Sequence, residues 1–413
     1  MKLSIRQFTT TAIKLAKPKK ASSTFIPKYL GRPSNNLSAG LVGLANVGKS
    51  TFFQALTKSK LGNPANYPFA TIEPSQALAK VTSDKLDHYQ KIFGSSKQVS
   101  SSLTIWDIAG LTRRASEGEG LGNQFLNDIR QVDGIYQVVR GFLDDEITHI
   151  ENSVDPVRDL SIVSDELILK DVEIVDKEIE NCKKLERRPG VNKISMNMMY
   201  DVLNRLSEHL WNGQKVSNMD INEFSDEEIA FINTLNLLTA KPTVYLLNVN
   251  EEDYASGTNQ FLSAVQEWIT ENSKSDEVLL VSAKHETTLT ELEGDELEEY
   301  VKLIGKDSAI SEVVSEMRKV LHLISFYTCG DIEARQWTLR EGSTAPEAAG
   351  LIHTDLQKNF INALAYKWDD LSKLDKFDEA KLKSAGKQYR HGKDYMVEDG
   401  DVLVIKAVGG KTR

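Results

Sequence analysis

The sequence predicts an α/β protein with a mostly parallel, doubly wound sheet, a helical insertion and a smaller C-terminal β-grasp module. Short apolar runs bounded by polar residues or glycine recur through the first 310 residues. At about 150–240 the apolar residues change to a helical spacing, and after about 310 the pattern changes again. A chain of 413 residues is too long for one hydrophobic core, so we expect two or three folded units.

Five apolar runs are expected to form the strands of the α/β domain, which we assign to residues 38–149 and 241–310. Leu41 and Val42 end the first run, and a glycine turn and a helix over about Ser50–Lys58 follow. Parallel strands between two helix layers are apolar on both faces, as these runs are. The repeated order of strand, loop and helix favours a doubly wound sheet. The other four runs are Leu103–Trp106, Ile135–Val139, Val244–Leu247 and Val278–Val281.

Residues 150–240 are expected to form an all-helical insertion. Two sets of apolar residues recur at spacings of four and three, and Pro189-Gly190 lies between them. This pattern predicts an antiparallel helical hairpin rather than one long helix. Ser225 and Glu228 form a capping box that starts a further helix through Leu238. The two sets are Ile168, Val172, Val175, Ile179 and Cys182, and Met199, Leu203, Leu206 and Leu210.

The C-terminal module is assigned to residues 321–408. Leu323–Tyr327 is predicted as a strand, with Trp337–Leu339 as its hairpin partner. Residues Pro346–Leu364 have helical periodicity, and Asp401–Ala407 is predicted as the closing strand. A strand pair, a helix and a final strand indicate a β-grasp fold. Cys182 and Cys329 have no metal-ligand spacing, so we expect two buried, reduced thiols.

Charge is distributed unevenly along the chain. The net charge is −10, yet the first acidic residue is Glu73 and eleven Lys or Arg precede it. The remaining chain carries 39 basic and 60 acidic residues, a net charge of −21. A body this acidic does not bind nucleic acid by bulk electrostatics, so we expect no sequence-specific DNA binding and only local contact with RNA. No stretch approaches the roughly 20 apolar residues of a membrane span, so no membrane partner is expected.

Residues 1–37 have the composition of a targeting leader. They are basic, rich in hydroxyl residues and free of acids, with interspersed apolar side chains. This is typical of a mitochondrial transit peptide and predicts a location in the mitochondrial matrix. A disordered basic tail on a cytoplasmic protein is the alternative.

Residues Gly43–Ser50 match the phosphate-binding pattern G-x-x-x-x-G-K-[ST] between a strand and a helix. Backbone N–H groups of such a loop and the start of its helix form an anion site. Lys49 is expected to contact the β- and γ-phosphates, and the Ser50 hydroxyl to bind Mg²⁺. The nucleotide-binding residues predicted here are Asn46, Val47, Gly48, Lys49, Ser50 and Thr51.

Further elements of a nucleotide switch follow in order. Asp107 ends an apolar strand and is placed to hold Mg²⁺ through water, while the backbone N–H of Gly110 can meet the γ-phosphate. Thr71 lies between the phosphate loop and Asp107, as expected of a threonine that closes on Mg²⁺ when the γ-phosphate is present. Leu111 follows Gly110, and it cannot orient water as a switch glutamine does. The catalytic residues considered are Lys49, Thr71 and Gln137.

Base recognition is predicted to favour adenine. Asn248-Val249-Asn250-Glu251 stands where a GTPase carries N-K-x-D. Replacing Asp by Glu251 and Lys by Val249 removes the group that reads guanine N1 and its 2-amino group. Asn248 can still pair with the N6/N7 edge of adenine. Ser282 and Ala283, after the strand that ends at Val281, are expected to form the second base-contacting loop.

Together these motifs resemble the Obg-like ATPase (YchF-type) branch of the Obg superfamily of P-loop NTPases. The resemblance runs from about Ser38 to Val408. Its longest motifs are Asn-Tyr-Pro-Phe-Ala-Thr-Ile-Glu-Pro at 66–74, Asp-Ile-Ala-Gly-Leu at 107–111, Glu-Gly-Glu-Gly-Leu-Gly-Asn at 117–123, Ser-Val-Asp-Pro-Val-Arg-Asp at 153–159, and Ala-Pro-Glu-Ala-Ala-Gly-Leu-Ile-His-Thr-Asp at 345–355 with Asp-Gly-Asp at 399–401.

The resemblance implies a G domain, a coiled-coil arm and a C-terminal TGS domain of β-grasp type. It also implies ATP preference over GTP, slow hydrolysis, association with the ribosome through its large subunit, and a potassium ion at Asn46. The chain departs from the family at Gln137, where many members carry a histidine proposed as catalytic. It also departs at Ala45, where proline is usual, and at Arg113-Arg114.

Three hypotheses about function follow. The first is an ATPase whose nucleotide state controls binding to a ribosome, and the second is a GTPase of ribosome assembly. The third is a nucleotide-gated scaffold with little turnover. The pair Asn248 and Glu251 favours the first over the second, and Gln137 keeps the third open. No histidine cluster or catalytic-loop motif supports a nuclease, a kinase or a metalloenzyme.

Overall fold

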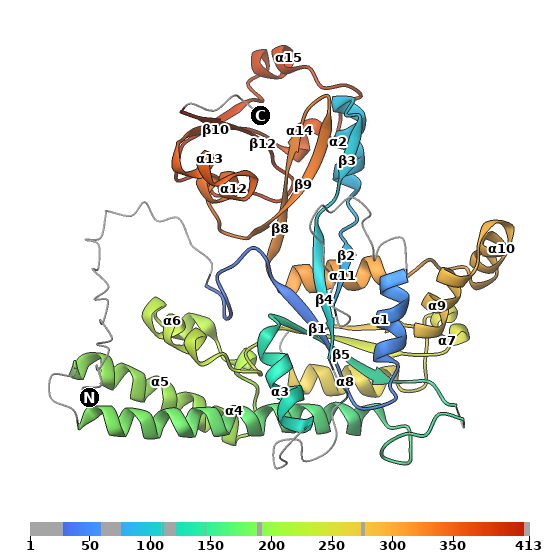
Figure 1. Ribbon diagram of the computed structural model, residues 1–413, viewed down its shortest axis with the longest axis vertical. Helices are drawn as coiled ribbons and strands as arrows, with labels where there is room; N and C mark the ends of the chain where they lie inside the picture. The colour runs from blue at the N-terminus through green and yellow to red at the C-terminus, as the bar shows by residue number, and fades with distance from the viewer. Residues whose placement is uncertain are drawn as a thin grey trace, which may run out of the picture.

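The computed structural model contains two six-stranded sheets and a helical arm (Figure 1). The structure describes residues 28–58, 76–108, 110, 121–144, 146–187, 192–273 and 277–408, with the side chains of 121–124 excepted. Thr71, Leu111 and Arg113-Arg114 lie outside these residues, as do Pro189-Gly190 and most of the leader. In the part of the chain described, no helix is long and apolar enough to cross a membrane.

The first sheet has the order β2-β4-β1-β5-β6-β7 and confirms the predicted α/β fold. Its neighbouring strands are parallel except for β2, an antiparallel edge strand that the sequence analysis missed. All residues of β5 and β6 are buried, which explains their continuous apolar character. The strands are β1 (Ser38–Val42), β2 (Gln76–Lys80), β4 (Ser102–Asp107), β5 (Gly134–Arg140), β6 (Thr243–Asn248) and β7 (Val278–Val281).

Helices cover this sheet. Helices α1 and α9 pack together, α8 contacts both β7 and the arm helix α4, and α11 contacts β6 and leads into the second sheet. The helices of this region are α1 (Lys49–Lys58), α3 (Leu121–Gln131), α7 (Glu251–Ser256), α8 (Leu262–Asn272), α9 (Ala283–Glu291), α10 (Gly294–Ile304) and α11 (Ile310–Val320).

The arm lies between β5 and β6 in the chain and is helical, as expected. Helix α4 (Pro156–Glu186) and helix α5 (Lys193–Trp211) lie side by side and share one apolar core (Figure 1). The capping box of Ser225 and Glu228 is confirmed and starts α6 (Asp226–Leu235). This helix ends three residues before the predicted Leu238, because Asn236 adopts a left-handed backbone conformation. Two short 3₁₀ turns, Val216–Asn218 and Ile221–Glu223, lie between α5 and α6.

The second sheet has the order β11-β10-β12-β8-β9-β3. The last strand, β12, lies parallel to β8 and antiparallel to β10, which is the β-grasp arrangement. The elements are α2 (Asp84–Phe93), β3 (Lys97–Val99), β8 (Leu323–Cys329), β9 (Glu333–Arg340), α12 (Ala345–Ile352), α13 (Thr354–Lys358), β10 (Phe360–Tyr366), α14 (Trp368–Leu371), α15 (Glu379–Ser384), β11 (Tyr389–His391) and β12 (Val402–Ala407).

Two sequence-based assignments in this sheet are wrong. The helix predicted over Pro346–Leu364 breaks at His353, whose backbone is extended, and Phe360–Tyr366 forms strand β10 instead. Strand β3 pairs with β9, and α2 packs on β8 and β9, although residues 38–149 were assigned to the first domain. Of the two free cysteines, Cys182 is buried as expected but Cys329 is only half-buried.

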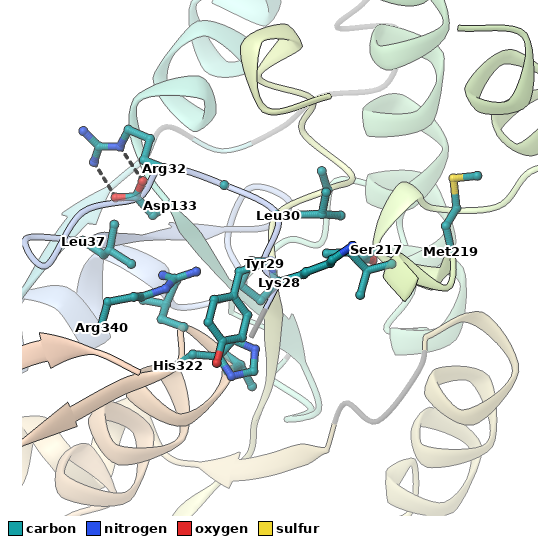
Figure 2. Close-up of a pocket in the computed structure, with 16 residues that line it drawn as sticks. Lys28, Tyr29, Leu30, Arg32, Leu37, Asp133, Ser217, Met219, His322 and Arg340 are labelled. Carbon is teal, nitrogen blue, oxygen red and sulfur yellow. Dashed lines mark hydrogen bonds and ion pairs between the residues drawn. The ribbon is translucent and has the colours of Figure 1, made fainter. Parts of the chain in front are cut away.

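Residues 28–37, assigned to the leader, are folded onto the protein. We call them the strap, because they contact all three parts of the molecule (Figure 2). Gly31 N donates to Asn233 of α6 at 2.7 Å, and Arg32 forms a paired salt bridge with Asp133 beside β5. Tyr29 stacks on His322 at 4.1 Å and donates to Glu341. The folded body therefore begins before Ser38, where the sequence analysis placed it.

Candidate nucleotide-binding site

The phosphate loop joins the carboxyl end of β1 to the start of α1, as its sequence predicts. Two of its glycines have no room for a side chain. A Cβ on Gly43 would lie 2.3 Å from the Val138 carbonyl oxygen, and one on Gly48, where φ is +96°, would lie 2.2 Å from Asn248 Nδ2. The loop therefore packs closely against β5 and against Asn248 at the end of β6.

Lys49 is buried in this loop and 6% exposed. Its ammonium donates to the carbonyl oxygens of Gly43 at 3.1 Å and Leu44 at 2.7 Å. Burial lowers the pKa of Lys49 to about 8, although the nearby Asp107 carboxylate opposes this effect. A buried cation with mainly neutral partners is a ready binding group for phosphate oxygens.

Ser50 and Asp107 come together as a candidate Mg²⁺ site. Burial raises the pKa of Asp107, although the nearby Ser50 hydroxyl and the Lys49 ammonium oppose this shift. Asp107 Oδ1 is buried and has no hydrogen-bond partner among the residues that the structure describes. A hydroxyl and an unsatisfied carboxylate oxygen are the ligands that Mg²⁺ prefers. Gly110 lies close to the same group, since a Cβ there would be 3.2 Å from Lys49 Nζ.

Asn248 is 3% exposed and holds three loops together. Its Nδ2 donates to the Val47 carbonyl at 2.9 Å, and its Oδ1 accepts from Ala283 N at 2.9 Å. Its own carbonyl accepts from Gly141 N. Ser282 caps α9 by accepting from His285 N, and Val249 N donates to the Val281 carbonyl. These predicted residues are therefore adjacent, and the adenine contact of Asn248 remains a prediction.

Glu251, the first residue of α7, is engaged by two side chains that the sequence analysis did not consider. Lys284 Nζ lies 2.7 Å from its Oε2, and the Tyr300 hydroxyl donates to its Oε1 at 3.2 Å. Tyr300 also bonds to His285 Nδ1 at 2.9 Å, and burial raises its pKa to about 12. Tyr300 lies 49 residues from Glu251, so no local pattern could have indicated it.

Gln137 lies at the centre of the sheet rather than at its edge. It is 1% exposed on β5, beside Val42 of β1 and Tyr245 of β6. Its Nε2 has no hydrogen-bond partner within the described part of the chain. Thr51 and Ser50 are exposed on α1. The catalytic roles of Gln137 and Thr71 remain predictions.

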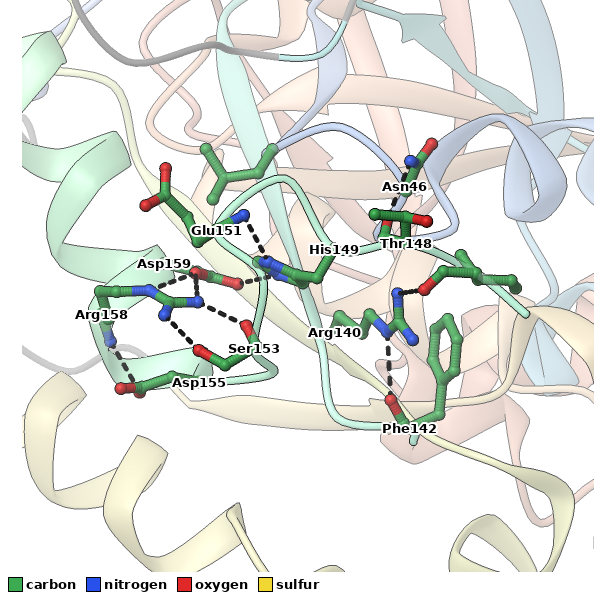
Figure 3. A network of polar contacts seen from close by, with 12 residues as sticks. Asn46, Arg140, Phe142, Thr148, His149, Glu151, Ser153, Asp155, Arg158 and Asp159 are labelled. Carbon is green, nitrogen blue, oxygen red and sulfur yellow. Dashed lines mark hydrogen bonds and ion pairs between the residues drawn. The ribbon is translucent and has the colours of Figure 1, made fainter. Parts of the chain in front are cut away.

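The exposed side chain of Asn46 has a partner that the sequence did not indicate. Asn46 adopts a left-handed backbone, with φ of 61°, and its Nδ2 donates to the Thr148 carbonyl at 3.0 Å (Figure 3). Thr148 lies in the segment between β5 and the arm helix α4. The phosphate loop is therefore connected to the base of the arm.

The fold and this constellation define a P-loop nucleotide hydrolase. Residues 38–182 match the family model described as a 50S ribosome-binding GTPase. Residues 323–408 match the YchF-GTPase C-terminal family, whose description is a protein of unknown function.

Whole-chain comparisons agree with the two family models. An Obg-like ATPase homolog of Saccharomyces cerevisiae is 50% identical, with 93% of this chain and 98% of that protein covered. Obg-like ATPase 1 of the same yeast is 47% identical over 92% of this chain and 96% of its own. The solved structure of the Schizosaccharomyces pombe YchF GTPase aligns with a TM-score of 0.82 and 42% identity, covering 92% of this chain and all of that one. The chain belongs to the Obg-like ATPase family.

Proposed function

We propose that this protein is a Mg²⁺-dependent ATPase that binds ATP in preference to GTP and uses its nucleotide state to control association with a ribosome. The observation that carries the nucleotide preference is the environment of Glu251. Both of its carboxylate oxygens are engaged, one by Lys284 and one by Tyr300. Guanine recognition uses a carboxylate that accepts from N1 and the 2-amino group, and Lys284 and Tyr300 compete with guanine for this carboxylate, so the arrangement disfavours guanine.

Each pocket residue has a role in this proposal. Lys49 contacts the β- and γ-phosphate oxygens, while Ser50 and Asp107 hold Mg²⁺, which would neutralise developing charge on the phosphates. The N–H of Gly110 is available to the γ-phosphate. Leu111 cannot orient the attacking water, and Gln137 is buried in β5. Hydrolysis is therefore expected to be slow without an added catalytic group.

Names of relatives differ on the nucleotide, since the yeast relatives are called ATPases and the solved relative a GTPase. Titration of both nucleotides with Mg²⁺ tests the preference directly. We expect ATP to bind at least about tenfold more tightly, a difference of about 1.4 kcal/mol. The double variant Glu251→Asp with Val249→Lys should move the preference toward GTP. Equal or tighter GTP binding by the wild-type protein would refute the proposal.

Gln137 is tested by restoring the family's usual residue. If this position orients water, Gln137→His should raise ATP turnover and Gln137→Ala should lower it, with ATP affinity unchanged. An unchanged rate in Gln137→His would remove any catalytic role from this position.

The same activity assay, with and without potassium, tests the predicted ion at Asn46. Sodium serves as the control cation.

The ribosome contact is proposed to use the basic surface around α15. Lys373, Lys376 and Lys381 are exposed and line a hollow together with Lys387. Lys383 is also exposed and lies on α15. Four acidic residues line the same hollow, namely Asp370, which pairs with Lys387 at 2.9 Å, and Asp375, Asp378 and Glu379. The proposed contact therefore relies on the exposed lysines themselves rather than on an excess of positive charge. Such side chains can bind RNA phosphates, and contacts of this kind weaken with added salt. The description of the matching family as ribosome-binding supports the same partner.

Sedimentation with ribosomes tests this surface. Reversing Lys381, Lys383 and Lys387 to Glu should abolish co-sedimentation at moderate salt while leaving ATP affinity unchanged. Reversal of three lysines outside this surface, Lys193, Lys302 and Lys319, is the control for net charge. Survival of sedimentation after the first reversal would show that the contact lies elsewhere.

We further propose a mitochondrial location, on the composition of the leader. Because the strap belongs to the folded body, the test should remove only residues 1–27 and keep residues 28–37. Cell fractionation should then show loss of mitochondrial enrichment. Enrichment that is unchanged, or absent from the full chain, would favour the cytoplasmic alternative.

A further inference from the structure

The segment between β5 and the arm is held by side chains that sequence reasoning did not single out. We call residues 146–155 the connector, since they end at Asp155, the N-cap of arm helix α4. Arg140, at the end of β5, is 1% exposed and donates to the Ile147 and Asp144 carbonyls, both at 2.9 Å. The start of the connector is thereby fixed to the central sheet.

A buried pair fixes the rest of the connector to the arm. His149 Nε2 lies 2.8 Å from Asp159 Oδ2, and the two side chains are 3% and 1% exposed. His149 Nδ1 accepts from Glu151 N at 3.1 Å, so the ring hydrogen is on Nε2 and is donated to Asp159. Asp159 Oδ1 accepts from Arg158, and burial raises the pKa of Asp159 although Arg158 and His149 oppose it. Asp159 belongs to the first turn of α4.

The residue before His149 contacts the phosphate loop. Thr148 precedes His149, and its carbonyl accepts from Asn46 Nδ2 at 3.0 Å. Holding the amide nitrogen also fixes the direction of the amide oxygen, since both belong to one planar group. The first turn of the arm and the Asn46 side chain are therefore joined through two consecutive residues.

We propose that His149 and Asp159 are positioning residues that hold Asn46 in its binding geometry, so that the nucleotide pocket and the base of the arm influence each other. This inference rests on the proposed function, because Asn46 has a ligand only if the pocket binds nucleotide. Linkage requires the influence to be reciprocal: whatever shifts the first turn of α4 changes nucleotide affinity, and nucleotide changes that turn.

The arm supplies a matched control. Asp171 lies on the same helix, is fully buried, and accepts from Leu238 N, Thr239 N and the Thr239 hydroxyl at 2.7–2.8 Å. Its partners join α4 to the segment before β6 and do not include the connector. Asp171→Asn therefore perturbs a buried carboxylate of α4 as severely as Asp159→Asn does, without disturbing Asn46.

The experiment measures the affinity of a fluorescent ATP analogue with Mg²⁺ and K⁺ present. We expect Asp159→Asn to bind about tenfold more weakly than the wild-type protein, as found when outer partners of binding residues are removed. Asp171→Asn should bind as the wild type does. If Asp159→Asn does not fold, His149→Asn replaces it, because asparagine can still accept from Glu151 N but loses Asp159.

A double-mutant cycle separates positioning from general loosening. Asn46→Ala alone should weaken binding, and adding Asp159→Asn or His149→Asn should cause little further loss, because both changes break one chain of contacts. Hydrogen exchange should slow at residues 156–167 when ATP is added to the wild-type protein, and should not change in Asn46→Ala.

Three outcomes would each overturn the inference. They are equal ATP affinities of the Asp159 and Asp171 variants, additive losses of affinity in the double-mutant cycle, and amide hydrogen exchange in α4 that does not change when ATP is added. Failure of the wild-type protein to bind ATP would instead refute the proposed function.

Discussion

The phosphate loop and the junction with the C-terminal module each bury one cation to the same extent, with opposite consequences. Lys49 and Arg318 are both 6% exposed. Lys49 donates to two backbone carbonyls of its own loop, five and six residues away. Arg318, on α11, donates to Thr338 of β9 and to Ile324 and Ser325 of β8, and so joins a helix to two strands.

The difference lies in what each cation can still bind. Burial lowers the pKa of both residues, so both carry a desolvation cost. The partners of Arg318 come from two neighbouring strands of a sheet, β8 and β9, and match the fixed, planar geometry of the guanidinium. The partners of Lys49 are two backbone carbonyls, and its ammonium can exchange them for phosphate oxygens. Similar burial therefore goes with a cation that joins three elements in one place and with a cation proposed to bind phosphate in the other.

The largest expected effect comes from neutralising the binding cation. Lys49→Met keeps the side-chain volume and removes the charge, so ATP affinity should fall at least about 100-fold, which is about 2.7 kcal/mol. The midpoint of urea unfolding should stay the same or rise, because a buried charge has been removed. Calorimetry and chemical unfolding measure the two quantities. A large loss of stability would show that Lys49, like Arg318, mainly stabilises the fold.

The matching change at the junction should have the reverse outcome. Arg318→Met removes three hydrogen bonds that join α11 to β8 and β9, so the free energy of unfolding should fall by about 2 kcal/mol. ATP affinity should be unchanged, since Arg318 contacts β8 and β9 rather than the phosphate loop. Weakened ATP binding in this variant would mean that the two regions are coupled.

The strap is a second structural contact at the junction with the C-terminal module, so it extends the comparison with the phosphate loop. Tyr29 lies between His322, stacked at 4.1 Å, and the Arg340 guanidinium, 4.9 Å from its ring centroid (Figure 2). Tyr29→Ala should destabilise the contact by about 1.5 kcal/mol and speed proteolysis near the strap. Tyr389→Ala, on the exposed β11, serves as the control and should change neither property. If the two variants behave alike, the strap contributes nothing to the junction.

The smallest effect concerns pH. The pKa of Lys49 is lowered to about 8, and bound phosphates favour its charged form. Below pH 8 the lysine is already charged, whereas above pH 8 ATP binding must take up a proton, so affinity falls as pH rises. The loss should be about fourfold between pH 7.0 and 8.5. Calorimetry at pH 8.5 in buffers of different ionisation enthalpy measures the uptake. Lys49→Met retains Lys241, which has a similarly lowered pKa, and should show no such uptake from the pocket.

The sequence by itself determined the parts of this protein whose information is local. The phosphate loop could be predicted because Gly43, Gly48, Lys49 and Ser50 act within one strand-loop-helix unit. The capping box of Ser225 and Glu228 likewise spans only four residues. The five parallel strands followed from runs that are buried on both faces, and the family from motifs in a fixed order.

Only the tertiary structure decided the contacts that join distant segments. Phe360–Tyr366 has apolar residues at spacings compatible with a helix, and pairing with β12 and β11 makes it a strand. Strand β3 belongs to the C-terminal sheet because β9 lies beside it, more than 230 residues later in the chain. Tyr300 reaches Glu251, and Thr148 reaches Asn46, through the packing of separate elements. No periodicity encodes such pairs, because their energy depends on which surfaces the completed fold brings together.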